Sequence, residues 1–207
     1  MATEPPKRRG RPPSGGREAI LDATLELLRE RGVASVTSRE VAQRAGVSDA
    51  SVYYHYTDKA GLLRAVFESG LQPLQALDER GITRGDRHET LISLAQAIEQ
   101  FLNQALPVVM AAQSDAELRD DLAAYMAEHD LGPHRGVQTL GAYLIAEQVA
   151  GRIAANADAE TIAFLLVAAC FLRAAQRQIM GHAHAEPLPT LEQTIATLDA
   201  LLRPPGD

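Results

Sequence analysis

The sequence predicts an all-α fold with a small N-terminal helical domain followed by a larger helical domain. Apolar residues recur at spacings of three and four along most of the 207 residues. No segment alternates strictly between apolar and polar residues, and helix start signals precede most of the apolar stretches. Hydrophobic residues make up 46% of the chain and charged residues 23%, which is sufficient for a packed core.

The first helix is predicted over residues 17–31. Residues 1–16 contain several Pro and Gly residues and no apolar periodicity, so we expect a flexible basic arm there. From Arg17 onward, apolar residues fall on one face of a helix, and Gly32 is its stop signal. We therefore place the start of the N-terminal domain, residues 17–64, at this helix.

Two short helices joined by a glycine turn are predicted next. The segment Thr37 to Glu40 is a capping box, in which each side chain accepts from the other residue's backbone amide, before a helix over residues 38–45. Gly46 ends that helix in the left-handed conformation. Ser48 caps a second helix over residues 49–56. The lengths of these helices and of the turn match a helix-turn-helix, which places its second helix in the major groove of DNA.

Residues 65–207 are predicted to form the larger helical domain. A helix beginning at Lys59 runs into it, with Pro73 near its end or at a kink. Further signals divide the remainder: Asp86 and Glu89 before a helix to about Leu106, Ser114 and Glu117 before another, a break at Gly132-Pro133, Asp158 before a helix to about Met180, and Thr190 and Gln193 before the last.

The composition of the second short helix favours a surface that reads DNA. It is too polar and aromatic to be buried all round, and only Val52 and Tyr56 are placed to face a core. Lys59, at the start of the next helix, is placed to bind a phosphate. In the N-terminal arm, Arg9 and Arg11 suit a narrow minor groove, although a disordered solubilising tail explains them equally well.

The distribution of charge agrees with a DNA-binding N-terminal part. The net charge of −7 argues by itself against nucleic acid, but residues 1–64 carry +3 and the remainder carries −10. One end of the protein can therefore approach a polyanion while the other end stays away from it.

The segment TSREVAQRAGVSDASVYYHYTDKAGLL, from Thr37 to Leu63, closely resembles the DNA-binding domain of TetR-type (tetracycline-repressor-like) transcriptional regulators. The preceding ILDATLELLRERGVASVT resembles the first helix and lead-in of that family. One departure is visible, because Ala60-Gly61 stands where many relatives have an acidic residue after the lysine. The resemblance implies a homodimer whose C-terminal domain dimerises and binds a small molecule, with release of the operator on ligand binding.

The resemblance also implies which residues contact a palindromic operator. Among the predicted contacts between Thr37 and Lys59, only Arg39 can make a bidentate guanine contact, and Ala50 is placed to touch a thymine methyl group. Serine and tyrosine hydroxyls then contact phosphates or base edges. Sequence specificity should depend mainly on apolar contacts, serine hydroxyls and DNA shape. The predicted DNA-binding residues are Arg9, Arg11, Thr37, Ser38, Arg39, Ser48, Ala50, Ser51, Tyr53, Tyr54, His55 and Lys59.

An effector site is predicted between helices of the C-terminal domain. The aromatic residues there are few and lie on separate helices, and an alanine-rich domain with scattered methionines can leave a cavity. Each aromatic taken singly also fits a plain core position. The predicted effector-binding residues are Phe67, Phe101, Gln104, Met110, Gln113, Tyr125, His129, Tyr143 and Gln148.

The last two helices have broad apolar faces, which predict a four-helix interface between two subunits. The alternative is that both helices pack onto their own domain, and the resemblance favours the dimer. The predicted interface residues are Phe164, Ala168, Phe171, Leu172, Ala175, Leu191, Ile195, Leu198 and Leu202.

Other functions find little support in the sequence. Cys170 is the only cysteine, and we expect it to be a small buried hydrophobe. His129, Asp130 and His134, and also His182 and His184, suggest a metal site, but no cysteine joins them, and a spacing of two suits a strand better than the expected loop. No cofactor is expected, and no nucleophile and base or paired acids suggest an enzyme. We expect a cytoplasmic, ligand-responsive regulator, most simply a repressor, with no membrane partner. The alternative is a DNA-binding regulator that responds to a protein partner, or is constitutive, with no small-molecule pocket.

Overall fold

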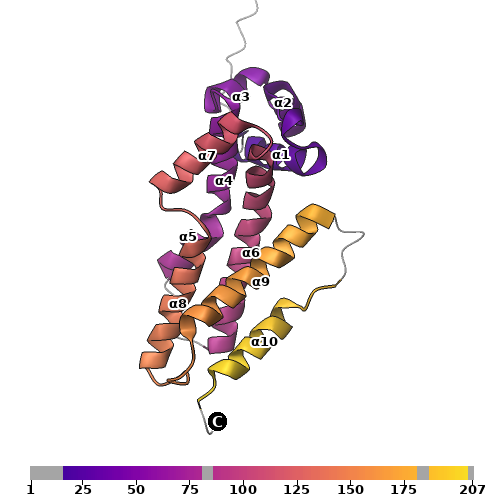
Figure 1. Cartoon of the computed structure of the whole chain (residues 1–207). Coiled ribbons are helices and arrows are strands. Elements are labelled where there is room, and N and C mark those ends of the chain that lie inside the picture. The colour runs from indigo at the N-terminus through magenta and orange to yellow at the C-terminus, as the bar shows by residue number, and fades with distance from the viewer. Residues whose placement is uncertain (1–15, 81–85, 181–186, 205–207) are drawn as a thin grey trace, which may run out of the picture.

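The computed structural model describes residues 16–80, 86–180 and 187–204. Within these ranges the chain forms ten α-helices and one 3-10 turn, and no strand occurs in them. The prediction of an all-α fold is therefore confirmed. In Figure 1 a compact group of short helices lies at the top, and the longer helices extend below it.

The head of the molecule, as we call residues 16–56, contains the predicted helix-turn-helix. It consists of α1 (Gly16–Arg31), the 3-10 turn η1 (Val33–Ser35), α2 (Ser38–Ala45) and α3 (Asp49–His55). These bounds agree closely with the predicted ones. Gly32 ends α1 with φ 73°, a backbone conformation that disfavours residues with a side chain.

Two helices lead out of the head. Asp58 caps α4 (Lys59–Gly70) by accepting the Gly61 amide at 2.7 Å. The chain turns at Leu71 and continues as α5 (Gln72–Arg80), so Pro73 lies in the first turn of a new helix. A proline is well tolerated there because the first amides of a helix have no intrahelical acceptor.

The body, residues 87–202, contains the remaining five helices. They are α6 (Arg87–Ala112), α7 (Ala116–Glu128), α8 (Pro133–Val149), α9 (Ala159–Met180) and α10 (Leu191–Leu202). The predicted end of α6 at Leu106 is wrong, because the helix continues through Pro107 to Ala112. The predicted cap of α7 is also wrong: Asp115 accepts the amides of Glu117 and Leu118, while the Ser114 hydroxyl donates to the Ala111 carbonyl.

Two large apolar clusters make up most of the core of the described residues. The first joins the head and α4 to the C-terminal half of α6 and to α7, with Val108 and Ala112 among its buried residues. The second joins the N-terminal half of α6 to α8, α9 and α10, around Leu144, Leu166 and Ile195. Because α6 contributes to both clusters, it is the element that connects the head to the rest of the body.

Helix α9 is long and apolar enough to cross a membrane by length and composition, with a mean hydropathy of 1.5 over its best 18-residue window. Of that window, 44% is buried within the protein. The inner side of α9 packs against α6 and α8 in the second apolar cluster. Cys170 lies on the inner side of α9 and is fully buried, as predicted.

Burial raises the pKa of the Cys170 thiol to about 12. The thiolate is the reactive form, so we expect no modification by Ellman's reagent in the native protein at pH 8 and full reaction after denaturation. Because this is the only cysteine, the absorbance change reports on it alone. A rapid reaction without denaturant would mean that the α6 and α9 packing opens readily.

Candidate nucleic-acid interface

The turn between α2 and α3 has the geometry that the sequence predicts. Gly46 adopts a left-handed conformation with φ 67° and ψ 28°, and its amide bonds back into α2. Ser48 then accepts the Ser51 amide at 3.2 Å and starts α3. The Ser38 hydroxyl donates to the Tyr53 hydroxyl at 3.1 Å, which links the beginning of α2 to the outer face of α3. The two helices are thus fixed to each other at both the turn and the outer surface.

Helix α3 divides its side chains between the core and the solvent. Val52 is buried and Tyr56, the residue that ends the helix, is nearly so. On the other side, Tyr53 is 60% exposed and Tyr54 is 81% exposed, although large aromatic side chains usually find cover. The edge of the Tyr54 ring meets His55, with ring centroids 5.2 Å apart. This exposed aromatic surface is available to a macromolecule.

The structure brings most of the predicted DNA-binding residues onto this one end of the molecule. Thr37, Arg39, Ser48 and Ala50 are exposed at the ends of α2 and α3. Ser38, Ser51, His55 and Lys59 are half-buried between them. Arg9 and Arg11 lie outside the described residues.

Lys59 has a structural contact that its sequence position did not indicate. Its ammonium donates to the Val33 carbonyl at 3.0 Å, so it ties the start of α4 to the turn after α1. The charge remains near the start of α4, but the side chain has a role in holding the head together. A phosphate contact by Lys59 stays a prediction.

Arg17 supports the end of α3 from the first turn of α1. Its guanidinium donates to the Tyr56 hydroxyl at 3.2 Å. This hydrogen bond raises the pKa of Arg17. The two residues are 39 positions apart, and no local sequence signal connects them.

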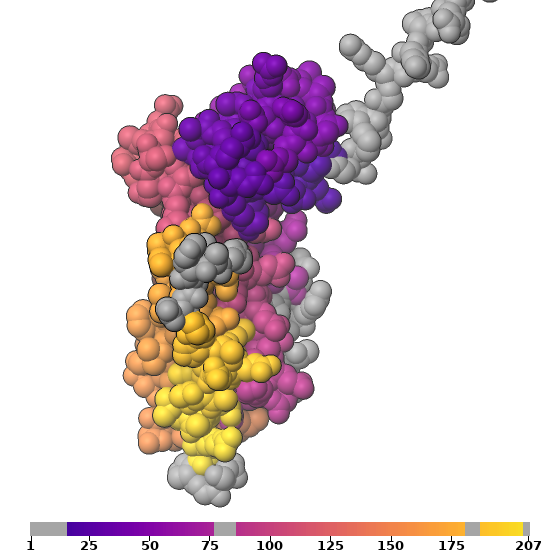
Figure 2. All heavy atoms as spheres, turned by 90° about the vertical axis from the view of Figure 1, so that its right-hand side faces the viewer, coloured from indigo at the N-terminus to yellow at the C-terminus, as the bar shows by residue number. Residues whose placement is uncertain are grey.

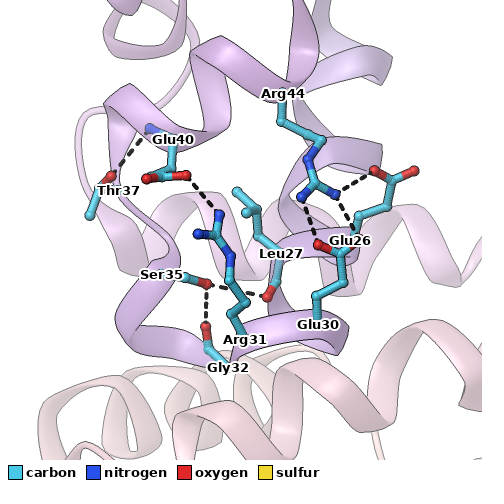
Figure 3. A network of polar contacts seen from close by, with 9 residues as sticks. All are labelled: Glu26, Leu27, Glu30, Arg31, Gly32, Ser35, Thr37, Glu40 and Arg44. Carbon is cyan, nitrogen blue, oxygen red and sulfur yellow. Dashed lines mark hydrogen bonds and ion pairs between the residues drawn. The ribbon is translucent and has the colours of Figure 1, made fainter.

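Charged residues clamp α2 onto α1, as Figure 3 shows. Arg44 donates to Glu30 at 2.6 and 2.9 Å and to Glu26 at 3.1 Å. Arg31 pairs with Glu40 at 2.7 Å. The capping box is therefore only half as predicted: Thr37 accepts the Glu40 amide, but the Glu40 carboxylate is turned toward Arg31.

The Arg44 clamp predicts a pH-dependent stability of the head. The hydrogen bond from Arg44 to the Glu30 carboxylate lowers the pKa of Glu30. A lowered folded-state pKa stabilises the fold above the unfolded value of about 4.3, and this stabilisation is lost as the pH falls through the folded-state pKa. We expect Arg44→Met to lower Tm at pH 7, with the difference from the wild type shrinking toward pH 3. Thermal melts at each pH measure it.

Arg135→Met is the control for that series, because Arg135 pairs with an exposed aspartate, Asp130, on the body. It should leave the melt almost unchanged at every pH. A Tm difference for Arg44→Met that does not change with pH would show that the carboxylates are not responsible.

Three of the predicted effector residues lie together. The rings of Phe67 (α4) and Phe101 (α6) meet edge to face with centroids 5.6 Å apart. Phe101 and Gln104 both lie against the backbone of Gly70, where an added Cβ would stand 3.1 Å from the Gln104 Oε1 atom. Among the described residues, that Oε1 atom is the buried side-chain polar atom without a hydrogen-bond partner. An unpartnered buried oxygen beside two aromatic rings is an unusual arrangement in a plain core.

The other predicted effector residues do not join this group as one site. Tyr125 packs against the same apolar cluster and stacks with His129, with centroids 4.3 Å apart. Tyr143 packs in the second cluster, and the Gln148 amide donates to the carbonyls of Ala154, Ala155 and Ala157. The structure also leaves three others exposed: Met110, Gln113 and His129.

An open cleft of about 450 Å³ lies between α1, α4, α5 and α7. Tyr125 is the one predicted effector residue that lines it, together with Glu68 and Arg17. Burial and a hydrogen bond to Glu68 raise the pKa of Tyr125 to about 12. The sequence did not reveal this cleft, because α1 and α7 are distant along the chain from α4 and α5.

The predicted dimer residues separate into two groups. On α9, Phe164, Phe171 and Leu172 are exposed, whereas Ala168 is half-buried and Ala175 is buried. The prediction for α10 is wrong: Ile195, Leu198 and Leu202 fill the second cluster of their own chain, and Leu191 packs beside them. Figure 2 shows α9 and α10 side by side on the face below the head.

Two histidines of the body, His129 and His134, have ordinary partners. His134 contacts Asp130 at 3.1 Å, and the His129 ring nitrogen contacts the Tyr125 carbonyl. No group of three metal-binding side chains occurs within the described ranges. His182 and His184 fall outside those ranges.

Comparisons with known proteins agree with the architecture of the head. The family profile described as "Bacterial regulatory proteins, tetR family" matches residues 20–66, which cover α1 to most of α4. The uncharacterized HTH-type transcriptional regulator YvkB of Bacillus subtilis is 25% identical over 141 residues, covering 68% of this chain and 72% of that protein. The class D tetracycline repressor of Escherichia coli is 42% identical over 50 residues, covering 24% of this chain and 23% of the repressor.

Solved structures with the same fold extend the likeness to the whole chain. The structure titled "SmeT-Triclosan complex" superposes with a TM-score of 0.65 at 21% identity, covering 93% of this chain and 94% of that one. NalD, titled the secondary repressor of the MexAB-OprM multidrug efflux pump in Pseudomonas aeruginosa, gives a TM-score of 0.61 at 18% identity, covering 91% and 96%. NalD is titled a repressor, and YvkB is named a transcriptional regulator. The head therefore matches the tetR family profile over residues 20–66, its relatives over that region are transcriptional regulators, and the chain shares its fold with the solved structures.

Proposed function

We propose that this regulator is a repressor that binds a palindromic operator as a homodimer and is released by a small-molecule effector. Residues 17–64 then contact DNA, residues 65–207 dimerise and bind the effector, and the arm at residues 1–16 follows the minor groove. The observation that best supports this proposal is the exposed aromatic surface of α3. Tyr53 and Tyr54 project there from a helix that is held to α2 at the turn and through Ser38.

The chemistry of this surface suits a DNA backbone. Hydroxyl groups of Tyr53, Tyr54 and Ser48 can donate to phosphate oxygens, and the exposed amides at the start of α3 favour an anion. Arg39 is exposed beside them for a guanine contact. Phosphate contacts make affinity fall steeply with salt, while base contacts and DNA shape supply sequence choice.

The dimer surface that we propose is the α9 face, defined as the exposed apolar side chains Phe164, Leu165, Phe171, Leu172, Ile179 and Met180. Most of them recur at spacings of seven and eight, which places them on one side of the helix. An exposed apolar surface of this size on one helix is typical of an interface. A second copy of the chain is the proposed occupant because operators of the proposed kind are palindromic and two-fold symmetry matches them.

The effector site that we propose is centred on Phe67, Phe101 and Gln104. The aromatic edge-to-face pair offers apolar contact, and the unpartnered Gln104 oxygen can accept a hydrogen bond from a ligand. The fold is compatible with small ligands, since the SmeT structure is titled as a complex with triclosan. An effector would shift the population of dimers whose heads fit the roughly 34–36 Å between successive major grooves. We place the protein in the cytoplasm, where its DNA target would lie.

Selection of bound duplexes from a random pool, repeated over a salt titration, tests the proposal. We expect an enriched palindrome and a steep loss of affinity with salt. Enrichment of a single half-site would contradict the dimer, and no enrichment by a folded protein would contradict sequence-specific binding. Once an operator is known, compounds that release it identify the effector, and a screen in which none does would favour control by a protein partner.

A further inference from the structure

Helix α6 contains a proline at a position that frees a backbone carbonyl. In a regular helix the amide of residue 107 would donate to the carbonyl of Asn103, four residues earlier. Pro107 has no N–H, so it cannot make this bond. The Asn103 carbonyl therefore needs another donor, and it lies where α6 passes from the second apolar cluster to the first.

Arg29 of α1 supplies that donor. Its Nη2 atom donates to the Asn103 carbonyl at 2.7 Å, across 74 positions of sequence. Partial burial of the guanidinium against α6 lowers the pKa of Arg29. The surrounding contacts between the head and α6 are apolar and non-directional, with Val108 and Ala112 at their centre. The hydrogen bond from Arg29 depends on geometry, so it constrains how α1 is oriented on α6.

The side chain of the same asparagine connects to α9. Its Oδ1 atom accepts from Arg177 at 3.0 and 3.3 Å. Arg177 also lies 3.7 Å from Glu99, which in turn accepts a hydrogen bond from Arg173. The backbone oxygen of Asn103 therefore bonds to the head through Arg29, and its side-chain oxygen bonds to α9 through Arg177.

We propose that Asn103, made available by Pro107, is the positioning residue that sets the angle of the DNA-binding head on the body and couples that angle to α9. This inference rests on the proposed function, because the angle matters for the spacing between two heads on an operator. Helix α9 packs against α6 within the chain and also carries the proposed dimer surface, so it lies between α6 and the partner subunit in the proposed dimer. Arg29, Asn103 and Arg177 then relate the head to the dimer axis.

The first test needs only the free protein. We expect Arg29→Met, which keeps the aliphatic stem and removes the donor, to lower Tm in the wild-type background. In a Pro107→Ala background the new amide donates to the Asn103 carbonyl, so the same substitution should lower Tm by much less. Arg31→Met is the matched control, because Arg31 lies on the same helix and pairs with Glu40 inside the head. Its effect should be equal in both backgrounds, and an equal effect of Arg29→Met in both would overturn the coupling.

The second test measures spacing on DNA. The palindrome selected by the wild type is compared with versions whose centre is one or two base pairs longer or shorter. We expect Arg29→Met to reduce the preference for the selected spacing by about tenfold, with unchanged affinity for a single half-site. Arg177→Met should change the preference in the same direction. A uniform loss at all spacings would overturn the proposal and mark Arg29 as a phosphate contact, and an unchanged preference for Arg177→Met would remove α9 from it.

The two proposals fail in different ways. If the wild type selects no duplex, the proposed function fails, and the Tm comparison still decides whether Pro107 makes the Asn103 carbonyl depend on Arg29. If the wild type selects a palindrome and Arg29→Met keeps its spacing preference, only the positioning role is overturned.

Discussion

Replacing Leu172 with arginine should convert the protein to a folded monomer and reduce its affinity for a palindromic operator by about 10²–10⁴-fold. Leu172 is 57% exposed at the middle of the α9 face, so the substitution introduces a charge without disturbing the core. Burying that charge between two apolar helices is strongly unfavourable. The large effect on DNA follows because the second head binds at a high effective concentration only while it is joined to the first.

Sedimentation and fluorescence anisotropy with a labelled operator measure the two effects. Val149→Arg is the control, since Val149 is an even more exposed apolar side chain, on α8 and outside the α9 face. It should leave the oligomeric state unchanged. If Leu172→Arg remains a dimer with the wild-type affinity, the dimer surface lies elsewhere.

Tyr54→Ala should lower operator affinity by about a hundredfold, because a hydrogen bond to a charged phosphate contributes about 1.5 kcal/mol in each of two subunits. Tyr54 is 81% exposed, so Tm should change little. Tyr54→Phe separates the hydroxyl from the ring: if the phosphate bond matters, it should resemble alanine. Wild-type affinity for Tyr54→Ala at physiological salt would rule out the docking of α3 in the major groove.

Lys59→Ala is a useful contrast to the Tyr54 variants. Its ammonium bonds the Val33 carbonyl, so removing it should lower both Tm and DNA affinity. A loss of affinity in that variant alone would therefore say little about a direct phosphate contact.

The local signals in the sequence predicted the head well, because each of them acts within a few residues. Gly46 and Ser48 depend only on the turn that they form, and both behave as predicted. The same holds for the Thr190 capping box of α10, in which both reciprocal bonds are present. The half-formed capping box at Thr37 shows the limit: Arg31 offers the Glu40 carboxylate a charged partner that the local pattern does not include.

The predictions that failed depend on tertiary contacts. An apolar stripe such as that of Ile195, Leu198 and Leu202 looks the same whether it covers its own core or a partner, and here it is in its own core. Likewise Pro107 is a helix breaker by local rules, yet α6 continues through it while Arg29 from another helix satisfies the freed carbonyl. The predicted effector residues were taken from helices whose packing the sequence could not specify, so they fall into separate groups, of which Phe67, Phe101 and Gln104 form one.

The burial of α10 affects how this regulator would be inactivated by mutation. A frameshift or early stop codon shortly before residue 191 leaves every proposed DNA contact intact, but it removes Ile195, Leu198 and Leu202 from the core. It also removes the Leu202 carbonyl that accepts the Ala154 amide at 2.9 Å. Loss-of-function truncations should therefore extend to the final codons of α10, although these codons encode no proposed DNA contact.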